Sequence, residues 1–409
     1  MKFFTAAFPL FLAIFIDGMG LGLFIPILNA LLTNPHMGFF THPVSTDMRH
    51  FWFGFTMSIF MLCWFFGAAY LGDLSDAIGR KKSLIIALSG AFLGYLLSAI
   101  AVTSGSLMLL VSGRVIAGFT AGSQSVAQAA IVDISPADLK ARNIGLILLS
   151  ASLGFVFGPM CGAFFSNADI FHGFNLSTPL YFTALVSLLN AVFLMFLFKE
   201  TFVPKSKPHF RFHHAINIFI SAFRHEKVRY LSFVLLLMLL GWSSYYSFIS
   251  MYLMERFHLN TLHIDIFLAA LAAGFGIGFG VIVNLLAHRF SMKISILASL
   301  GLSALLISIG ILGHHILYSW IVVAPIGVVV AVAYSMLLTL LSNQVDENAQ
   351  GWIMGITNSI LAVGFAITGI LSALLANWNI ALPLWFAASF LCLSGIAMFY
   401  SRHKEVKSA

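Results

Sequence analysis

The sequence predicts an all-α integral membrane protein, built from twelve transmembrane helices arranged as two pseudo-symmetric six-helix bundles. Three observations predict this class: an apolar composition, twelve apolar runs of membrane-spanning length, and an uneven distribution of basic residues. Of the 409 residues, 60% are hydrophobic and 9% are charged, whereas a typical soluble domain carries about 25% charged residues. Such a chain cannot cover a globule of its size with a solvated surface. This argues against a soluble enzyme, a disordered chain and a nucleic-acid-binding protein.

Each apolar run is long enough to cross the hydrocarbon core, which takes roughly 20 residues of helix. The predicted spans are 4–31, 51–71, 83–103, 107–131, 143–165, 178–199, 230–254, 263–287, 294–313, 316–342, 352–375 and 380–400. The first run contains Asp17 and lacks a small-residue cleavage site. We therefore interpret it as a retained span and not as a secretory leader.

The basic residues predict the orientation of these spans. All but three of the 21 Lys and Arg residues fall on the side that carries both termini. The exceptions are Arg49 and Arg256, on the opposite side, and Arg114, inside a span. Because Lys and Arg accumulate in cytoplasmic segments, we expect both termini to be cytoplasmic and the protein to lie in the cytoplasmic (inner) membrane. The net charge of +7 then reflects topology.

The longest hydrophilic stretch divides the chain into two bundles. It covers residues 200–229 and separates a first bundle, 1–199, from a second bundle with a short tail, 230–409. Apolar and basic residues alternate in this stretch, which fits an amphipathic helix on the cytoplasmic face of the membrane and equally a basic linker.

Weak matches at a fixed offset indicate an internal repeat of the two bundles. Gly154 and Phe155 in the fifth span correspond to Gly364 and Phe365 in the eleventh. Transporters built from such repeats bind their substrates where the repeats meet. We therefore expect a substrate site at the interface of the halves.

Two ionisable residues lie well inside predicted spans, Asp17 in the first and Arg114 in the fourth. A charge at the bilayer centre costs roughly 2.5–3.5 kcal/mol on insertion scales, so such residues usually face a cavity or a partner. From the helical rise, Asp17 lies ~20 Å from the cytoplasmic end of its span and Arg114 ~10 Å from the outer end of its own. In a core ~30 Å thick the two share nearly one level. An Asp17–Arg114 pair is therefore geometrically allowed. Asp17 is interpreted as a proton-exchanging carboxylate, with a static buried ion pair as the alternative.

Four segments carry a family resemblance. They are Asp17–Pro26 in the first span, Gly72–Lys81 between the second and third, Arg114–Gly122 in the fourth and Gly154–Gly162 in the fifth. In this order they resemble the motifs of the major facilitator superfamily, in particular its twelve-helix drug:proton antiporters such as the tetracycline and multidrug exporters. The resemblance implies the superfamily's fold, a monomer without cofactors, and the proton gradient as the energy source.

The resemblance also assigns roles to individual residues. The proton-coupling residues are Asp17 and Arg114, the cytoplasmic gate is Gly72, Asp76, Gly79, Arg80, Lys81 and Asp133, and the antiporter motif is Gly154, Gly158, Pro159 and Gly162. We expect Asp133 to pair with Arg80, and Asp76 to meet the N-terminus of a helix in the other half. Gly18, Gly20 and Gly22 should let the first span approach a neighbour closely.

The chain departs from the family pattern at three places. Ala77 stands where the loop signature usually has Arg, and Ala117 stands where the fourth-helix motif often has Gln. The ninth span has no acidic residue, unlike that of some tetracycline exporters. Tetracycline is therefore not expected to be the substrate.

Polar and aromatic side chains inside the spans are candidates for lining a substrate cavity. They are Gln124, Gln128, Trp242, Tyr245, Tyr246, Asn284, Tyr334 and Asn358. An aromatic cavity suits an amphipathic organic molecule, and a cation binds well on aromatic faces. Ordinary helix packing explains the same residues. No cysteine or histidine pattern predicts a metal site or a disulfide framework.

These observations predict a proton-coupled secondary transporter that exports drugs or small amphipathic organic molecules. Its expected partners are protons, the lipid bilayer and a small-molecule substrate. A dedicated exporter or importer of one endogenous metabolite or siderophore remains the alternative, with Arg114 as the counter-charge of an organic anion. A membrane sensor without flux is disfavoured, because the chain has no sizeable soluble domain. An intramembrane enzyme is disfavoured, because no span carries a catalytic constellation.

Overall fold

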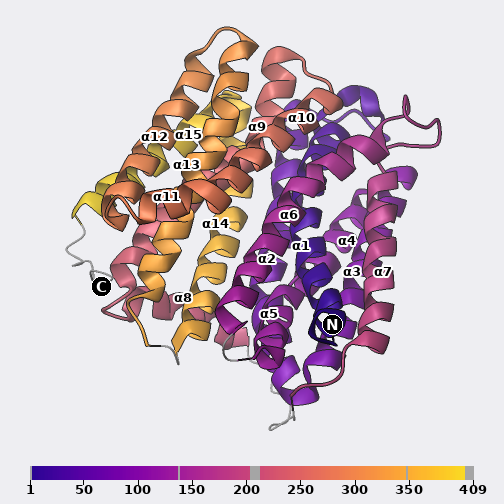
Figure 1. The fold of residues 1–409 in the computed structure, drawn as a ribbon. Coiled ribbons are helices and arrows are strands. Elements are labelled where there is room, and N and C mark those ends of the chain that lie inside the picture. The colour runs from indigo at the N-terminus through magenta and orange to yellow at the C-terminus, as the bar shows by residue number, and fades with distance from the viewer. Residues whose placement is uncertain (1, 137–138, 203–211, 347–348, 401–409) are drawn as a thin grey trace. The chain divides into compact units, whose positions relative to one another are not determined.

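The computed structural model describes residues 2–136, 139–202, 212–346 and 349–400, and every regular element in those ranges is a helix (Figure 1). The chain forms two compact units, Met1–Ala215 and Ile216–Ala409. The boundary between them falls within the predicted linker 200–229.

Unit 1 contains six membrane-spanning segments. Its helices are α1 (Lys2–Thr33), the 3₁₀ turn η1 (Pro35–Met37), α2 (Thr46–Ile78), α3 (Arg80–Ser104), α4 (Leu107–Thr120), α5 (Ser123–Ile134), α6 (Lys140–Ser166) and α7 (Thr178–Leu197). The predicted fourth span is interrupted at Ala121 and Gly122, so it consists of α4 and α5 in series. A helix therefore begins inside the membrane at Ser123.

Unit 2 contains the other six. Helix α8 (Phe212–Arg224) leads into it, followed by α9 (Arg229–Phe257), α10 (Thr261–Ile277), the π-helical turn η3 (Gly278–Ile282), α11 (Val283–Ala287), α12 (Met292–Leu312), α13 (Ile316–Ser342), α14 (Gln350–Trp378) and α15 (Leu382–Tyr400). The described residues thus contain 12 helical segments long and apolar enough to cross a membrane. The predicted span count and fold class are confirmed.

The two units repeat the same packing scheme. In unit 1, α1 packs on α6, α3 on α4 and on α7, and α2 on α4. In unit 2, α9 packs on α14, α12 on α13 and on α15, and α10 on α13. Counted as spans, these are the same four pairs in each half. The sequence repeat, weak at any single position, therefore corresponds to a repeated helix arrangement.

Glycines allow a close helix contact in unit 1, between α1 and α6. A Cβ built on Gly154 would lie 3.1 Å from the Cα of Gly18, and one on Gly158 would lie 3.0 Å from the Cα of Gly22. Small residues allow such backbone approach in membranes, where helix association depends on van der Waals contact. The expected close approach at Gly18 and Gly22 is thus observed, and the neighbour is the antiporter-motif helix.

Gly20 faces a different helix. Its missing side chain leaves room for the hydroxyl of Tyr95 on α3, which occupies the place a Cβ would take. Helix α3 in turn crosses α4 closely: a Cβ on Gly94 would lie 2.8 Å from the carbonyl oxygen of Gly113. These two contacts bring Tyr95 and Arg114, the residues that follow Gly94 and Gly113, into one region of unit 1.

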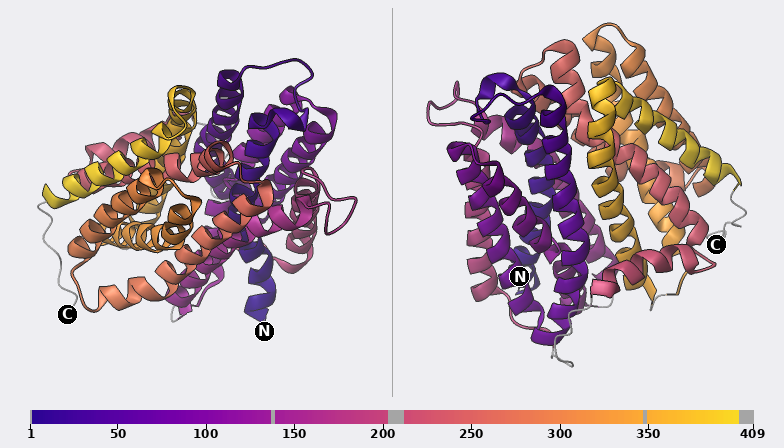
Figure 2. Two further views of the ribbon diagram at one scale, coloured as in Figure 1. Left: turned by 90° about the horizontal axis from the view of Figure 1, so that it is seen from above. Right: turned by 180° about the vertical axis from the view of Figure 1, so that it is seen from behind.

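Helix α8 occupies the middle of the hydrophilic stretch, where an amphipathic helix was one of two expectations. It runs across the direction of the neighbouring spans (Figure 2, right). The indole Nε1 of Trp352, on α14, donates to the hydroxyl of Ser221 at 3.0 Å, and the ring of His225 lies 5.0 Å from that indole. These contacts fix α8 to the first turn of α14. Residues 203–211 of the stretch lie outside the described residues.

Candidate functional site

The carboxylate of Asp17 is held by the beginning of α5. The hydroxyl of Ser123 donates to its Oδ2 at 2.6 Å, and the backbone N–H of Gln124 is a second donor. Amide groups in the first turn of a helix lack intrahelical partners and carry partial positive charge, which makes this end favourable for an anion. The interruption of the fourth span thus supplies Asp17 with its binding partners.

Arg114 has different surroundings. Its side chain is 1% exposed, and the guanidinium carbon lies 3.8 Å from the ring centroid of Phe24 and 3.8 Å from that of Phe60. Cation–π attraction of this kind strengthens when the cation is desolvated. None of the three guanidinium nitrogens has a hydrogen-bond partner among the described residues.

The Asp17–Arg114 ion pair that their equal depth allows is therefore not formed between these two side chains in this structure, and their role in proton coupling stays a prediction. The physical reason is competition: Ser123 and the start of α5 bind the carboxylate, while two phenyl rings bind the guanidinium. Depth along two helices limits which residues can meet, but it does not fix the direction in which each side chain points.

Three of the predicted gate residues, Asp76, Arg80 and Asp133, form a charge cluster around Arg80. The guanidinium lies 2.8 Å from Asp76 and 3.3 Å from Asp133, also donates to the hydroxyl of Ser75, and sits 4.8 Å from the ring centroid of Phe202. The expected Arg80–Asp133 contact is thus present. Asp76 has its ion pair inside unit 1, and its expected interaction with the other half stays a prediction.

Glu200 completes this cluster by capping α3. Its carboxylate accepts from the backbone N–H groups of Arg80 at 2.9 Å and Lys81 at 3.0 Å, while the ammonium of Lys81 donates to the carbonyl of Met195 at 2.7 Å. An acidic group at a helix N-terminus satisfies free amides and complements the helix dipole. The carboxylate occupies the space beside Gly79, whose φ of 98° favours glycine. Gly72, by contrast, has open space where its side chain would be.

The predicted cavity aromatics of unit 2 are buried in helix packing. Trp242 stacks on Tyr246 with ring centroids 5.5 Å apart, and it meets Phe275 of α10 at 5.0 Å. Trp242 and Tyr246 are each 9% exposed and Tyr245 is 2% exposed. These contacts are what the packing alternative predicts, and a role in lining a substrate path stays a prediction.

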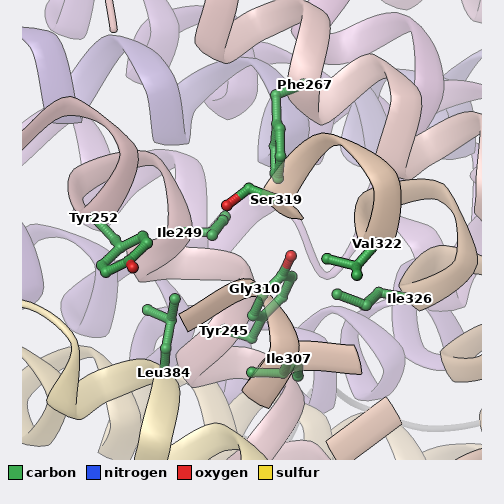
Figure 3. A pocket seen from close by; sticks show the side chains of 10 residues that line it. All are labelled: Tyr245, Ile249, Tyr252, Phe267, Ile307, Gly310, Ser319, Val322, Ile326 and Leu384. Carbon is green, nitrogen blue, oxygen red and sulfur yellow. The ribbon is translucent and has the colours of Figure 1, made fainter. Parts of the chain in front are cut away.

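A small pocket inside unit 2 is lined by residues of α9, α10, α12, α13 and α15 (Figure 3). Tyr245 is the predicted cavity residue that lines it, together with Tyr252 and Ser319. It has room for about one water molecule. An organic substrate does not fit this pocket as it stands.

The remaining candidate cavity residues are less enclosed. Gln124 and Gln128 on α5 are half-buried, as are Tyr334 on α13 and Asn358 on α14, whereas Asn284 on α11 is exposed. The structure thus brings Asp17 and Gln124 together, and it keeps the unit 2 candidates on four separate helices, α9, α11, α13 and α14.

The antiporter-motif residues on α6 have unequal contacts. Gly154 and Gly158 touch the α1 backbone, and Cδ of Pro159 would lie 2.8 Å from a Cβ on Gly22. Gly162 has more room, with its nearest neighbour 3.8 Å from a Cβ built there. Three members of the motif therefore form the α1–α6 contact.

Three further residues belong to these sites without standing out in the sequence, Ser123, Tyr95 and Glu200, and a fourth, Asp265, is a buried acid elsewhere in unit 2. Asp265, on α10, is 1% exposed, and its Oδ1 has no hydrogen-bond partner among the described residues. Its signal in the sequence is an acidic residue between Ile264 and Ile266, a few residues inside an apolar run. The signal of Glu200 is an acid directly after the sixth span, in a basic segment.

The sequence profile of the Major Facilitator Superfamily matches residues 10–369. The chain belongs to this superfamily. It is 27% identical to the class C tetracycline resistance protein of Escherichia coli over 373 residues, with 89% of each chain covered. It is 26% identical to the class H tetracycline resistance protein of Pasteurella multocida, with 96% of each chain covered.

Its fold is similar to that of the human organic anion transporter MFSD10, with a TM-score of 0.72, 19% identity, and coverage of 96% of this chain and 99% of that one. Membership in the Major Facilitator Superfamily makes the chain a multi-pass membrane transporter and not an enzyme.

Proposed function

We propose that this chain is a proton-coupled exporter of drugs or small amphipathic organic molecules, working by alternating access. The observation that carries the proposal is the environment of Asp17, a carboxylate inside a membrane span whose donors are a hydroxyl and a backbone amide. Burial disfavours the charged form of a carboxyl, and hydrogen-bond donors favour it. A carboxyl balanced between these effects, with no ion pair among the described residues, is suited to take up and release a proton.

The cycle that we infer uses the contacts of Asp17 as its switch. Protonation from outside weakens the hydrogen bond from Ser123, because a neutral carboxyl is a weaker acceptor than a carboxylate. This loosens α1 from the beginning of α5 and favours opening toward the cytoplasm. Loss of the proton to the cytoplasm restores the contact and accompanies substrate capture and return.

The tetracycline resistance proteins that resemble the chain over most of its length support the drug-exporter class. The absence of an acid in the ninth span still favours a substrate other than tetracycline. We further propose a monomer in the cytoplasmic (inner) membrane with both termini cytoplasmic, no cofactor, and the proton gradient as energy source.

The test is transport by purified protein in proteoliposomes, with Asp17→Asn compared with wild type and with Asp47→Asn, a matched change at the exposed first turn of α2. We expect Asp17→Asn to lose substrate accumulation driven by an imposed pH gradient and to keep downhill exchange. Asp47→Asn should retain both activities. Full gradient-driven accumulation by Asp17→Asn would exclude Asp17 as the proton carrier.

A second candidate function is transport of one endogenous organic anion, such as a siderophore or another metabolite. The observation in its favour is Arg114, whose three guanidinium nitrogens have no hydrogen-bond partner in the described part of the chain. A carboxylate or a similar anion would satisfy them. Inhibition of transport by organic anions and not by organic cations, with Arg114→Gln abolishing that selectivity, would favour this candidate. The reverse selectivity would exclude it.

A further inference from the structure

Tyr95 lies within electrostatic range of both Asp17 and Arg114. It is on α3, 5% exposed, and it follows Gly94 at the point where α3 crosses α4. On the other side of that crossing, Arg114 follows Gly113, and the two glycines touch backbone to backbone. The crossing therefore brings the backbones at Tyr95 and Arg114 close together.

The hydroxyl of Tyr95 rests against α1. It occupies the position that a Cβ on Gly20 would take, so any other residue at position 20 would displace it. Gly20 is three residues after Asp17, so these two residues are neighbours on one face of α1. The Tyr95 hydroxyl therefore lies against α1 close to Asp17, the one carboxylate on this helix.

Both charges act on the Tyr95 hydroxyl. They are the Arg114 guanidinium and the Asp17 carboxylate. The hydrogen-bond donors to Asp17 itself are the Ser123 hydroxyl and the Gln124 N–H, and Tyr95 lies within electrostatic range of this carboxylate. From α2, the titratable group within electrostatic range of Arg114 is the Cys63 thiol. Within the described residues, α6 and α7 bring no charged side chain to Asp17.

We propose that Tyr95 is a positioning residue for proton coupling: its hydroxyl, seated on Gly20, transmits the charge of Asp17 to Arg114. This inference rests on the proposed proton-coupled function and adds a residue to it. A hydroxyl donates one hydrogen bond and accepts others, and it reorients by rotating about its C–O bond. The Tyr95 hydroxyl can therefore reorient when the charge of Asp17 changes, without any movement of the ring.

The two orientations of the hydroxyl follow the proton. When Asp17 is ionised, the Tyr95 O–H turns toward the carboxylate as a donor. When water delivers a proton to Asp17, that attraction ends, and the hydroxyl oxygen becomes an acceptor for the unpartnered N–H groups of Arg114. No covalent bond of Tyr95 changes, and the transferred proton stays on the carboxyl.

The experiment compares Tyr95→Phe with wild type and with Tyr181→Phe, which removes a hydroxyl from the exposed face of α7. Two activities are measured in proteoliposomes across a range of pH: downhill exchange, and accumulation against a gradient driven by pH. Phenylalanine keeps the ring and its packing, so downhill exchange should stay within about twofold of wild type. Accumulation should fall at least tenfold, which corresponds to about 1.4 kcal/mol, and the pH profile of exchange should flatten.

The control Tyr181→Phe should leave both activities and the pH profile unchanged. A second variant, Gly20→Ala, displaces the hydroxyl without removing it and should reproduce the flattened profile. If Tyr95→Phe keeps the wild-type pH profile and accumulation, the inference is overturned while the proposed function stands. If exchange and accumulation fall in step, Tyr95 is structural and the inference is again overturned. If wild type itself shows no pH-driven accumulation, both proposals fail.

Discussion

The Ser123 hydroxyl and the Asp17 carboxylate form a 2.6 Å hydrogen bond between the start of α5 and the middle of α1. Ser123 is available for it because the fourth span is interrupted at Ala121 and Gly122. A Cβ on Gly122 would lie 2.6 Å from the backbone of Ala68 on α2. The interruption is therefore packed against α2. As a result, Asp17 lies beside the N-terminus of α5 inside the membrane.

Replacing Ser123 with Ala should impair proton coupling, because it removes a donor to a charged group. Hydrogen bonds to charged groups contribute roughly 1.5–3 kcal/mol, so we expect gradient-driven accumulation to fall about tenfold or more. The measurement is accumulation at several values of imposed pH gradient. Ser125→Ala is the matched control, because its hydroxyl donates to the Gly122 carbonyl and not to Asp17. Equal effects of the two variants would contradict a specific role for Ser123.

Gly79→Ala should destabilise the protein strongly. The left-handed φ of 98° strains any residue with a side chain, and a Cβ there would collide with the carboxylate of Glu200 that caps α3. We expect a loss of about 2 kcal/mol or more from backbone strain and the lost cap together. Thermal unfolding in detergent is the measurement. Gly72→Ala, in the same motif with open space around it, should be neutral or slightly stabilising, and a similar loss there would contradict this account.

Gly154→Val should disrupt unit 1 more than Gly162→Val. At Gly154 a side chain would meet the α1 backbone, while at Gly162 the nearest atom is 3.8 Å from a Cβ. Overpacking of a tight contact costs typically 1–3 kcal/mol. The yield of folded, monodisperse protein and its unfolding temperature measure the difference. If both substitutions are tolerated equally, the α1–α6 contact does not depend on glycine.

The Arg80 cluster should contribute little to stability. The Asp133 side chain is 32% exposed and the Asp76 side chain 54% exposed, and exposed ion pairs are worth about 0–1 kcal/mol. A double-mutant cycle with Arg80→Gln and Asp133→Asn should therefore give a coupling free energy of unfolding below about 1 kcal/mol, decreasing with added salt. Asp76→Asn serves as the comparison. A coupling of several kcal/mol would show that the pair is desolvated and important for folding.

The sequence by itself determined the class of this protein. Twelve apolar runs follow from the length needed to cross a bilayer, and glycines at spacings of four, such as Gly18 with Gly22 and Gly154 with Gly158, already mark one face of a helix. The Arg80–Asp133 contact could also be predicted from the sequence, because both residues lie at span ends on the same side of the membrane. Such features depend on local composition and spacing, which the sequence states directly.

Only the tertiary structure decided the partners of the two buried charges. Spacing put Asp17 and Arg114 at one depth, but the packing of α2 against the interrupted fourth span turned Ser123 toward Asp17 and left Arg114 between Phe24 and Phe60. The rotation of each helix about its axis depends on the shape of every neighbour that it packs against. Since that rotation decides which side chains meet, equal depth in the membrane was not enough to predict the pair.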